Sequence, residues 1–140
     1  MRKMKALIID DRSVSGTGGM VYHAVLEARG HAVRSIDAPL VHDAEFRVHY
    51  TAEMFDHILA DAREFSPDWV IMVLQGRDSS DQIAAARAIY KETSTTKFYF
   101  ISGYPHKEEL DHVRSQGLNL RFEEMPIHPV KLVADLEQSF

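Results

Sequence analysis

The sequence contains no cysteine, which excludes disulfide bonds, thiol catalysis and thiolate metal sites. It also shows no signal peptide and no apolar run long enough to cross a bilayer, so we expect a cytoplasmic protein without a membrane partner. Basic residues are few and scattered: 16 lysines and arginines stand against 21 aspartates and glutamates, for a formal net charge of −5. Because nucleic-acid binding depends on clustered basic side chains, we expect no direct nucleic-acid partner.

Apolar runs alternate with helical patterns along the 140 residues, which are enough for one domain spanning 1–140. The runs expected to form strands are 6–11, 31–36, 69–74, 98–101 and 118–122. The segments with helical spacing are 20–30, 51–65, 81–90, 107–115 and 129–140. Five strands and five helices in strict alternation, joined by right-handed crossovers, predict an α/β fold: a three-layer (βα)5 sandwich around a five-stranded parallel sheet.

Two connecting segments are longer than the others. Residues 12–19 are rich in glycine and are interpreted as a flexible turn. Residues 37–50 contain Pro39 and show no clear period, which predicts a long loop. Long loops in compact domains often bind something, and here Phe46, Val48 and Tyr50 are candidates for a partner-binding lip.

The first apolar run ends in two adjacent carboxylates, Asp10 and Asp11. In a parallel α/β sheet, functional groups gather where the strands end, and two like charges side by side need either water or a cation. A site for a divalent ion or a phosphate group is one interpretation. The other is that both carboxylates cap the strand and begin a solvated loop, and these six residues alone do not separate the two.

The turn Gly16-Thr17-Gly18-Gly19 and the histidines are further candidate sites. Backbone amides at such a turn, followed by a helix N-terminus, can hold an anion, although the segment matches neither a Walker motif nor a dinucleotide fingerprint and flexibility explains its glycines equally well. None of the eight histidines has a partner at the i, i+4 spacing of a helical zinc site. We therefore expect solvated or helix-end histidines.

Four fragments follow one another in a characteristic order: Ile8-Ile9-Asp10-Asp11, Pro67-Asp68-Trp69-Val70-Ile71-Met72, Ile101-Ser102-Gly103-Tyr104, and a closing stretch that covers residues 122–132. Together they resemble the CheY-like receiver domain of bacterial two-component response regulators. The resemblance covers nearly the whole chain and implies a flavodoxin-like fold. It also implies a signalling role in place of an enzymatic one.

In receivers, an acidic pair binds Mg²⁺ beside a phosphorylated aspartate, and a lysine contacts the phosphoryl group. The resemblance assigns Asp10 and Asp11 to the metal pair, and it assigns Ser102 and Phe122 to the hydroxyl and aromatic switch positions. It assigns Val73 to the phospho-acceptor position and Met125 to the lysine position.

Neither of these two side chains can take part in phosphoryl transfer. Val73 has no lone pair with which to attack phosphorus, and Met125 carries no positive charge to hold the phosphoryl oxygens. With one of three carboxylate ligands missing, Mg²⁺ should bind only weakly to Asp10 and Asp11. The chain is therefore interpreted as a pseudo-receiver, and no other cofactor is expected.

Three functions are compatible with these residues. The first is a protein-interaction module that works without phosphorylation; the resemblance implies that a partner, or a second copy of the chain, binds the face formed by 107–115, 118–122 and 129–140. The second is a response regulator with displaced acceptor chemistry at Asp10, Asp11 and Asp78, although Asp78 is more typical of a cap for the following helix. The third is a small flavodoxin-like domain that binds a ligand at the Gly16–Gly19 turn.

Overall fold

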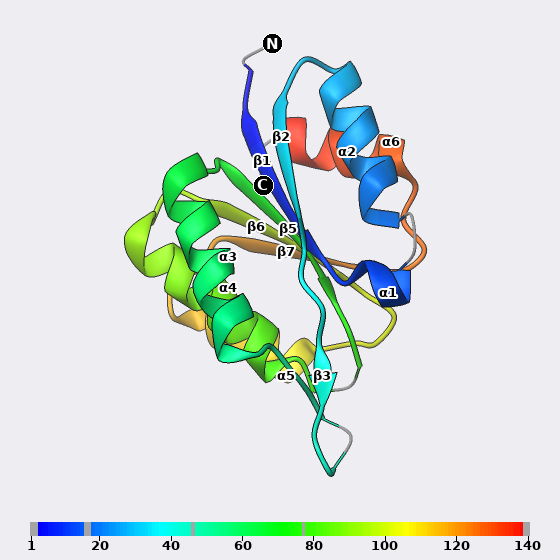
Figure 1. Cartoon of the computed structure of the whole chain (residues 1–140). Helices are drawn as coiled ribbons and strands as arrows, with labels where there is room; N and C mark the ends of the chain where they lie inside the picture. The colour runs from blue at the N-terminus through cyan, green and yellow to red at the C-terminus, as the bar shows by residue number, and fades with distance from the viewer. Residues whose placement is uncertain (1–2, 16–17, 46, 77, 139–140) are drawn as a thin grey trace.

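A five-stranded parallel sheet forms the centre of the protein (Figure 1). The computed structural model describes residues 3–15, 18–45, 47–76 and 78–138. The strands, in their order across the sheet, are β2 (Ala32–Asp37), β1 (Lys5–Asp10), β5 (Trp69–Leu74), β6 (Lys97–Ser102) and β7 (Leu120–Glu124). The predicted α/β sandwich with a five-stranded parallel sheet is confirmed.

Helices cover both faces of this sheet. Helices α2 (Gly18–Ala28) and α6 (Pro129–Glu137) lie on one face, and α3 (Ala52–Phe65), α4 (Ser80–Glu92) and α5 (Lys107–Ser115) lie on the other (Figure 1). Each face has its own apolar core, and all six residues of β5 are buried between them. This double burial explains why β5 is the most continuous apolar run in the sequence. No helix within the described ranges combines the length and the apolar character that a membrane span requires.

Local signals set the ends of α3 as predicted. The Thr51 hydroxyl oxygen accepts a hydrogen bond from the Met54 amide at 3.1 Å, which satisfies one of the open donors of the first turn. Ser66 ends the helix in the left-handed region, with φ of 51°. Pro67 follows and cannot continue a helix, so the chain turns here into β5.

The interpretation of residues 12–19 as a flexible turn is wrong where the structure describes them. Arg12–Ser15 forms a short helix, α1, and α2 already begins at Gly18. The Asp11 carboxylate accepts hydrogen bonds from the amide and the hydroxyl group of Ser13, which fixes the backbone as it leaves β1. Gly16 and Thr17 lie outside the described residues.

The predicted long loop 37–50 is also wrong, because Asp37 ends β2 and the segment contains an antiparallel hairpin. Its strands are β3 (Val41–His42) and β4 (Val48–His49), each too short to show a period of two in the sequence. Val48 and Tyr50 are only 8% and 7% exposed, so neither belongs to an exposed partner-binding lip. Phe46, the third residue of that prediction, lies outside the described residues.

Strand β7 forms one edge of the sheet and begins two residues later than the predicted strand 118–122. Leu118 is buried ahead of the strand, so its apolar character marks the core and not the start of the ladder. The strand continues to Glu124, which pairs with Ser102 at the end of β6.

Candidate functional site at the carboxyl edge of the sheet

The parallel strands bring the predicted site residues to one edge of the sheet. Asp10 ends β1, Val73 is the penultimate residue of β5, and Ser102 ends β6. Met125 directly follows β7, and its amide donates a hydrogen bond to the Ser102 carbonyl oxygen at 2.8 Å. Four segments far apart in the sequence therefore meet here, as the carboxyl ends of parallel strands do.

Val73 and Met125 line the same pocket, which has a volume of about 290 Å³. Val73 is 2% exposed and Met125 is 42% exposed, so the first lies deep in the wall and the second nearer to solvent. The other lining residues are Val14, Gly19, Tyr22, Gln75, Pro126 and Ile127. None of the described residues that line it is charged, and most of them are apolar.

The two carboxylates beside this pocket are both buried, at 3% exposure each. Besides its bonds to Ser13, Asp11 accepts a hydrogen bond from the Leu40 amide at 3.1 Å. Asp11 thereby joins the start of α1 to the chain that follows β2. Its carboxylate has a structural role, which the sequence analysis placed only among the alternatives.

The Asp10 carboxylate lies against the first turn of α2. A Cβ atom added to Gly19 would come 2.5 Å from Asp10 Oδ2, so only glycine fits at this point without a displacement. A negative charge at a helix N-terminus is favourable, because the amide dipoles point toward it. Burial, and then the charge of Asp10, raise the pKa of the Tyr22 hydroxyl.

This carboxylate bears on the predicted anion site at Gly16, Thr17, Gly18 and Gly19. Gly16 and Thr17 lie outside the described residues, while Gly18 and Gly19 are the first residues of α2. The Asp10 carboxylate already occupies the space beside Gly19, where a Cβ atom would come 2.5 Å from Asp10 Oδ2. Anion binding at this turn stays a prediction.

Asp78 lies just before α4, and its carboxylate binds Ser80, the first residue of that helix. Its Oδ1 accepts hydrogen bonds from the Ser80 amide at 3.1 Å and the Ser80 hydroxyl at 2.6 Å, and these bonds lower the pKa of Asp78. Across residues 3–15, 18–45, 47–76 and 78–138, no three histidine, aspartate or glutamate side chains are grouped so that they could hold a metal ion. Weak Mg²⁺ binding by Asp10 and Asp11 therefore stays a prediction.

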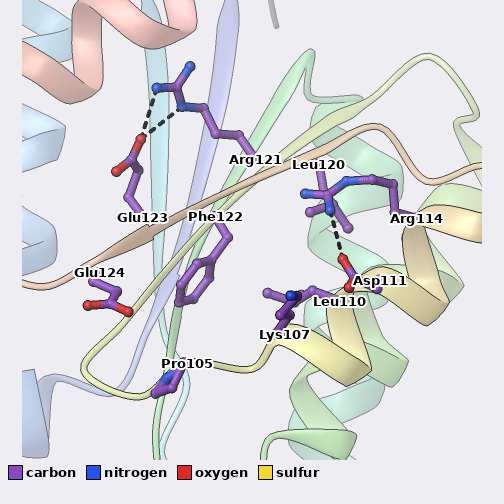
Figure 2. A pocket seen from close by; sticks show the side chains of 10 residues that line it. All are labelled: Pro105, Lys107, Leu110, Asp111, Arg114, Leu120, Arg121, Phe122, Glu123 and Glu124. Atoms are coloured by element: carbon purple, nitrogen blue, oxygen red, sulfur yellow. Dashed lines mark hydrogen bonds and ion pairs between the residues drawn. The ribbon is translucent and has the colours of Figure 1, made fainter.

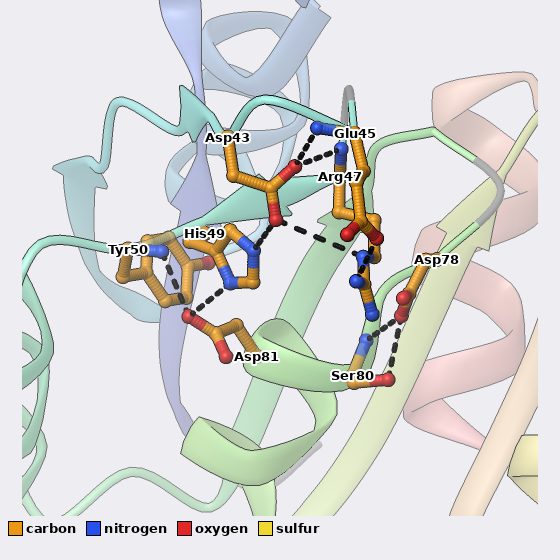
Figure 3. Close-up of polar contacts among 8 residues, drawn as sticks. All are labelled: Asp43, Glu45, Arg47, His49, Tyr50, Asp78, Ser80 and Asp81. Atoms are coloured by element: carbon orange, nitrogen blue, oxygen red, sulfur yellow. Dashed lines mark hydrogen bonds and ion pairs between the residues drawn. The ribbon is translucent and has the colours of Figure 1, made fainter.

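The β3–β4 hairpin docks on the start of α4 through a histidine between two carboxylates (Figure 3). His49 Nε2 lies 2.8 Å from Asp43 Oδ2, and His49 Nδ1 lies 3.4 Å from Asp81 Oδ2. The Tyr50 amide donates to the same Asp81 oxygen at 3.1 Å. The hydrogen bond between His49 and Asp43 raises the pKa of His49. The same bond lowers the pKa of Asp43 to about 2.

His106 is a residue that the sequence analysis missed. It is 4% exposed, and its two ring nitrogens lie 3.2 Å from the Ser79 hydroxyl and 3.0 Å from the Ser102 hydroxyl. Its ring also meets the Phe122 ring edge to face, with centroids 6.5 Å apart. One buried imidazole thus connects the two predicted switch positions, Ser102 and Phe122. Its place four residues after Ser102, at the start of a helix, is the only sequence signal that could have suggested this.

His106 lies at a helix end, as expected, because it is the N-cap residue of α5. The expectation of solvated or helix-end histidines is wrong for His31. This side chain is 4% exposed and accepts a hydrogen bond from the Met4 amide through Nδ1. Its Nε2 lies 2.8 Å from Glu137, whose other oxygen binds Arg29. This network ties the end of α6 to Met4, the residue directly before β1.

A second, larger pocket lies between α5 and β7 and has a volume of about 580 Å³ (Figure 2). Its apolar residues include Leu110, Leu120 and Phe122. Charged residues of both signs surround them, namely Lys107, Asp111, Arg114, Arg121, Glu123 and Glu124. We call this pocket the α5–β7 groove. It lies on the face that the resemblance assigns to partner binding.

No family model matches the sequence, and no curated protein does either. Solved structures do match. A CheY-like receiver domain protein from Methanospirillum hungatei JF-1 is 14% identical with a TM-score of 0.72, over 98% of this chain and 93% of its own. The chemotaxis protein CheY4 of Vibrio cholerae is 18% identical with a TM-score of 0.66, over 99% and 100%.

A response regulator from Burkholderia pseudomallei, described with a phosphorylated aspartic acid and a calcium ion, is 19% identical with a TM-score of 0.65, over 94% of this chain and 65% of its own. Such low identities carry information about the fold alone. The chain therefore has the CheY-like fold of response-regulator receiver domains.

Proposed function

We propose that this protein is a receiver-type module of two-component signalling that acts through protein contacts and without aspartyl phosphate chemistry. The observation that carries the proposal is the pocket shared by Val73 and Met125. An acceptor carboxylate and a lysine would have to face each other there for phosphoryl transfer, and a hydrocarbon and a thioether stand in their place.

The buried carboxylates do not replace the missing acceptor. Asp11 is held by Ser13 and Leu40, and Asp10 lies against α2. Asp78 is bound to Ser80 at the start of α4. Before Asp10, Asp11 or Asp78 could attack a phosphoryl donor, its carboxylate would have to leave these contacts.

The α5–β7 groove is the surface that we propose for the partner. Apolar side chains beneath a rim of both charge signs are typical of a surface that buries a few apolar residues of a partner and orients it by charge. A second copy of the chain is one candidate partner, because in a symmetric contact the positive side chains of one rim can pair with the negative side chains of the other. Without a phosphoryl switch, binding would be constitutive or would depend on another ligand.

Intact mass after incubation with acetyl phosphate and Mg²⁺ tests the absence of phosphorylation. We expect no phosphoryl adduct on the natural chain and an adduct on the double variant Val73→Asp/Met125→Lys, which restores the acceptor and the cation. Val130→Lys, at an exposed position of α6, is the matched control for added charge. An adduct on the natural chain that disappears in Asp78→Ala would establish the displaced chemistry and contradict the proposal.

Sedimentation of the purified chain tests the second-copy form of the contact. If the groove forms a dimer, Arg114→Glu should shift the equilibrium toward monomer, because it reverses a rim charge. Arg87→Glu, on the exposed side of α4, makes the same charge change elsewhere. Equal shifts in both variants would show that the groove is not the interface.

A further inference from the structure

A further pocket lies between α4 and the end of α5, two helices on the same face of the sheet (Figure 1). Its volume is about 280 Å³, and we call it the α4–α5 pocket. The residues that line it are Arg87, Tyr90 and Lys91 of α4, Val113 of α5, and Gln116 and Leu118 after that helix. None of them lines the α5–β7 groove or the pocket of Val73 and Met125, so the proposed function leaves the α4–α5 pocket without a role.

The floor of the α4–α5 pocket is apolar. Val113 and Leu118 are each 3% exposed and belong to the core on this face of the sheet, and the Tyr90 ring packs against the same core. The Tyr90 hydroxyl lies beside the turn after α5, because a Cβ atom added to Gly117 would come 3.5 Å from its oxygen. Ligand pockets span about 300 to 1,000 Å³. A volume of about 280 Å³ therefore has room for one aromatic ring or a short apolar chain.

The rim of the α4–α5 pocket carries positive charge. Arg87 and Lys91 are both exposed, and no aspartate or glutamate is among the described residues that line the pocket. The two cations lie four residues apart on one side of α4, where like charges repel each other by about 0.2–0.5 kcal/mol. The acidic residue next to Lys91 in the sequence, Glu92, is already engaged, because its carboxylate pairs with Arg63 of α3 at 2.6 Å. A ligand would have to supply the negative charge that these side chains lack.

Neither Arg87 nor Lys91 forms a hydrogen bond or an ion pair through its side chain within residues 3–15, 18–45, 47–76 and 78–138. Other arginines do pair with carboxylates, namely Arg29, Arg34, Arg47, Arg63, Arg114 and Arg121. Lys91 lies in the last turn of α4, where the helix dipole favours a cation. Because that effect fades beyond the last turn, it does not account for Arg87.

From the size of the α4–α5 pocket, its apolar floor and the two cations at its rim, we infer that it binds a small organic anion, a carboxylate attached to one aromatic ring or to a short apolar chain. The planar guanidinium group of Arg87 can hold a carboxylate through two parallel hydrogen bonds, and Lys91 adds a second positive charge. The apolar body covers Val113 and Leu118, which an inorganic anion would leave uncovered. This binding goes beyond the proposed function, because the α5–β7 groove has none of the same lining residues.

Titration with benzoate, benzyl alcohol and benzylamine tests the inference, because these probes share an aromatic ring and differ in the charge of the end group. At low ionic strength, where exposed charges are screened least, we expect benzoate to bind about tenfold more tightly than benzyl alcohol and benzylamine to show no saturable binding. Acetate has the same carboxylate without the ring and should bind about tenfold more weakly than benzoate. Backbone amide NMR supplies the readout, with Gly117 shifting and Gly30, after α2 on the other face of the sheet, as the internal reference.

Two variants locate the binding site at exposed helix positions, where glutamine keeps the helix propensity and the fold is retained. Arg87→Gln should weaken benzoate about tenfold and leave benzyl alcohol unchanged, because it removes the charge that only the carboxylate meets. Lys91→Gln should weaken benzoate by a smaller factor, since lysine acts as a point charge. Lys3→Gln, at an exposed position before β1, makes the same charge change outside the pocket and should leave benzoate binding unaltered.

Several results would overturn the inference. They are no saturable binding of benzoate at millimolar concentration, equal affinity for benzoate and benzyl alcohol, binding of acetate as tight as that of benzoate, and equal losses in Arg87→Gln and Lys3→Gln. Because all of these are measured on the probes, they leave the proposed partner contact untouched. Sedimentation contains no benzoate, so Arg87→Glu remains a control there, and a phosphoryl adduct on the natural chain would leave the benzoate titration unaffected.

Discussion

Replacing Gly19 with alanine should destabilise the protein, although alanine is the better helix former. Gly19 is the second residue of α2, and its missing side chain is what allows the Asp10 carboxylate to lie beside the helix. A Cβ atom would come 2.5 Å from Asp10 Oδ2 and 3.3 Å from Asp10 Cβ. The first distance is far inside van der Waals contact, so Asp10 or α2 would have to move.

Two opposing effects set the magnitude. Forcing extra atoms into a packed site costs about 1–3 kcal/mol. The higher helix propensity of alanine offsets at most about 1 kcal/mol of this cost, and less in the first turn of a helix. We therefore expect Gly19→Ala to lower the free energy of unfolding by about 1–2 kcal/mol. In an Asp10→Ala background the 2.5 Å contact is gone, and the same substitution should become neutral or stabilising.

Urea unfolding of the natural chain, Gly19→Ala, Asp10→Ala and the double variant measures the coupling energy between positions 10 and 19. The buried tryptophan, Trp69, supplies the fluorescence signal, and Gly103→Ala serves as the control because no atom lies within 4 Å of its added Cβ. Stabilisation by Gly19→Ala in the natural background, or a coupling energy near zero, would refute the close approach of Asp10 to α2.

Further measurements address the hairpin and the sheet. Because its folded pKa is raised, His49 should stabilise the hairpin fully below about pH 6.5, and this contribution should fade as the pH rises through the folded pKa. Asp43, whose pKa is lowered to about 2, should stabilise above about pH 4 and lose its effect as the pH falls toward that value, so docking against Asp81 is strongest between the two limits. Amide exchange of the hairpin in the natural chain and in His49→Gln checks this, and identical pH profiles would contradict it. Tyr99→Phe removes a hydroxyl that donates to Asp135 at 2.7 Å and should cost about 1–2 kcal/mol in urea unfolding; a loss below about 0.5 kcal/mol would speak against this bond.

The fold was largely predictable because the pattern of buried strands is local. Trp69–Leu74 is covered on both faces and reads as one continuous apolar run, and Thr51 carries its own cap signal. The hairpin was not predictable, since its two-residue strands are too short to show a period and its docking depends on His49 meeting Asp81 across 32 positions. Residue patterns over a short stretch of sequence do not indicate a contact between residues so far apart.

The position of the predicted site residues at one edge of the sheet was predictable, and their contacts were less so. The strand ends place Asp10, Val73 and Met125 around one corner, as a parallel sheet requires. The sequence did not reveal that a glycine is needed beside Asp10, nor that His106 joins two switch positions. Both facts arise from side chains that meet only after the sheet has formed.

Among the described residues, no strand pairs with the outer side of β7, and the charges of β7 restrict how other chains can approach this margin of the sheet. Arg121 pairs with Glu123, and Lys131 of α6 contacts the same carboxylate at 2.8 Å. Charged side chains on a terminal strand discourage another chain from adding its backbone to the ladder. Growth into fibres by strand addition is thereby disfavoured at this margin, and recognition here has to proceed through side chains.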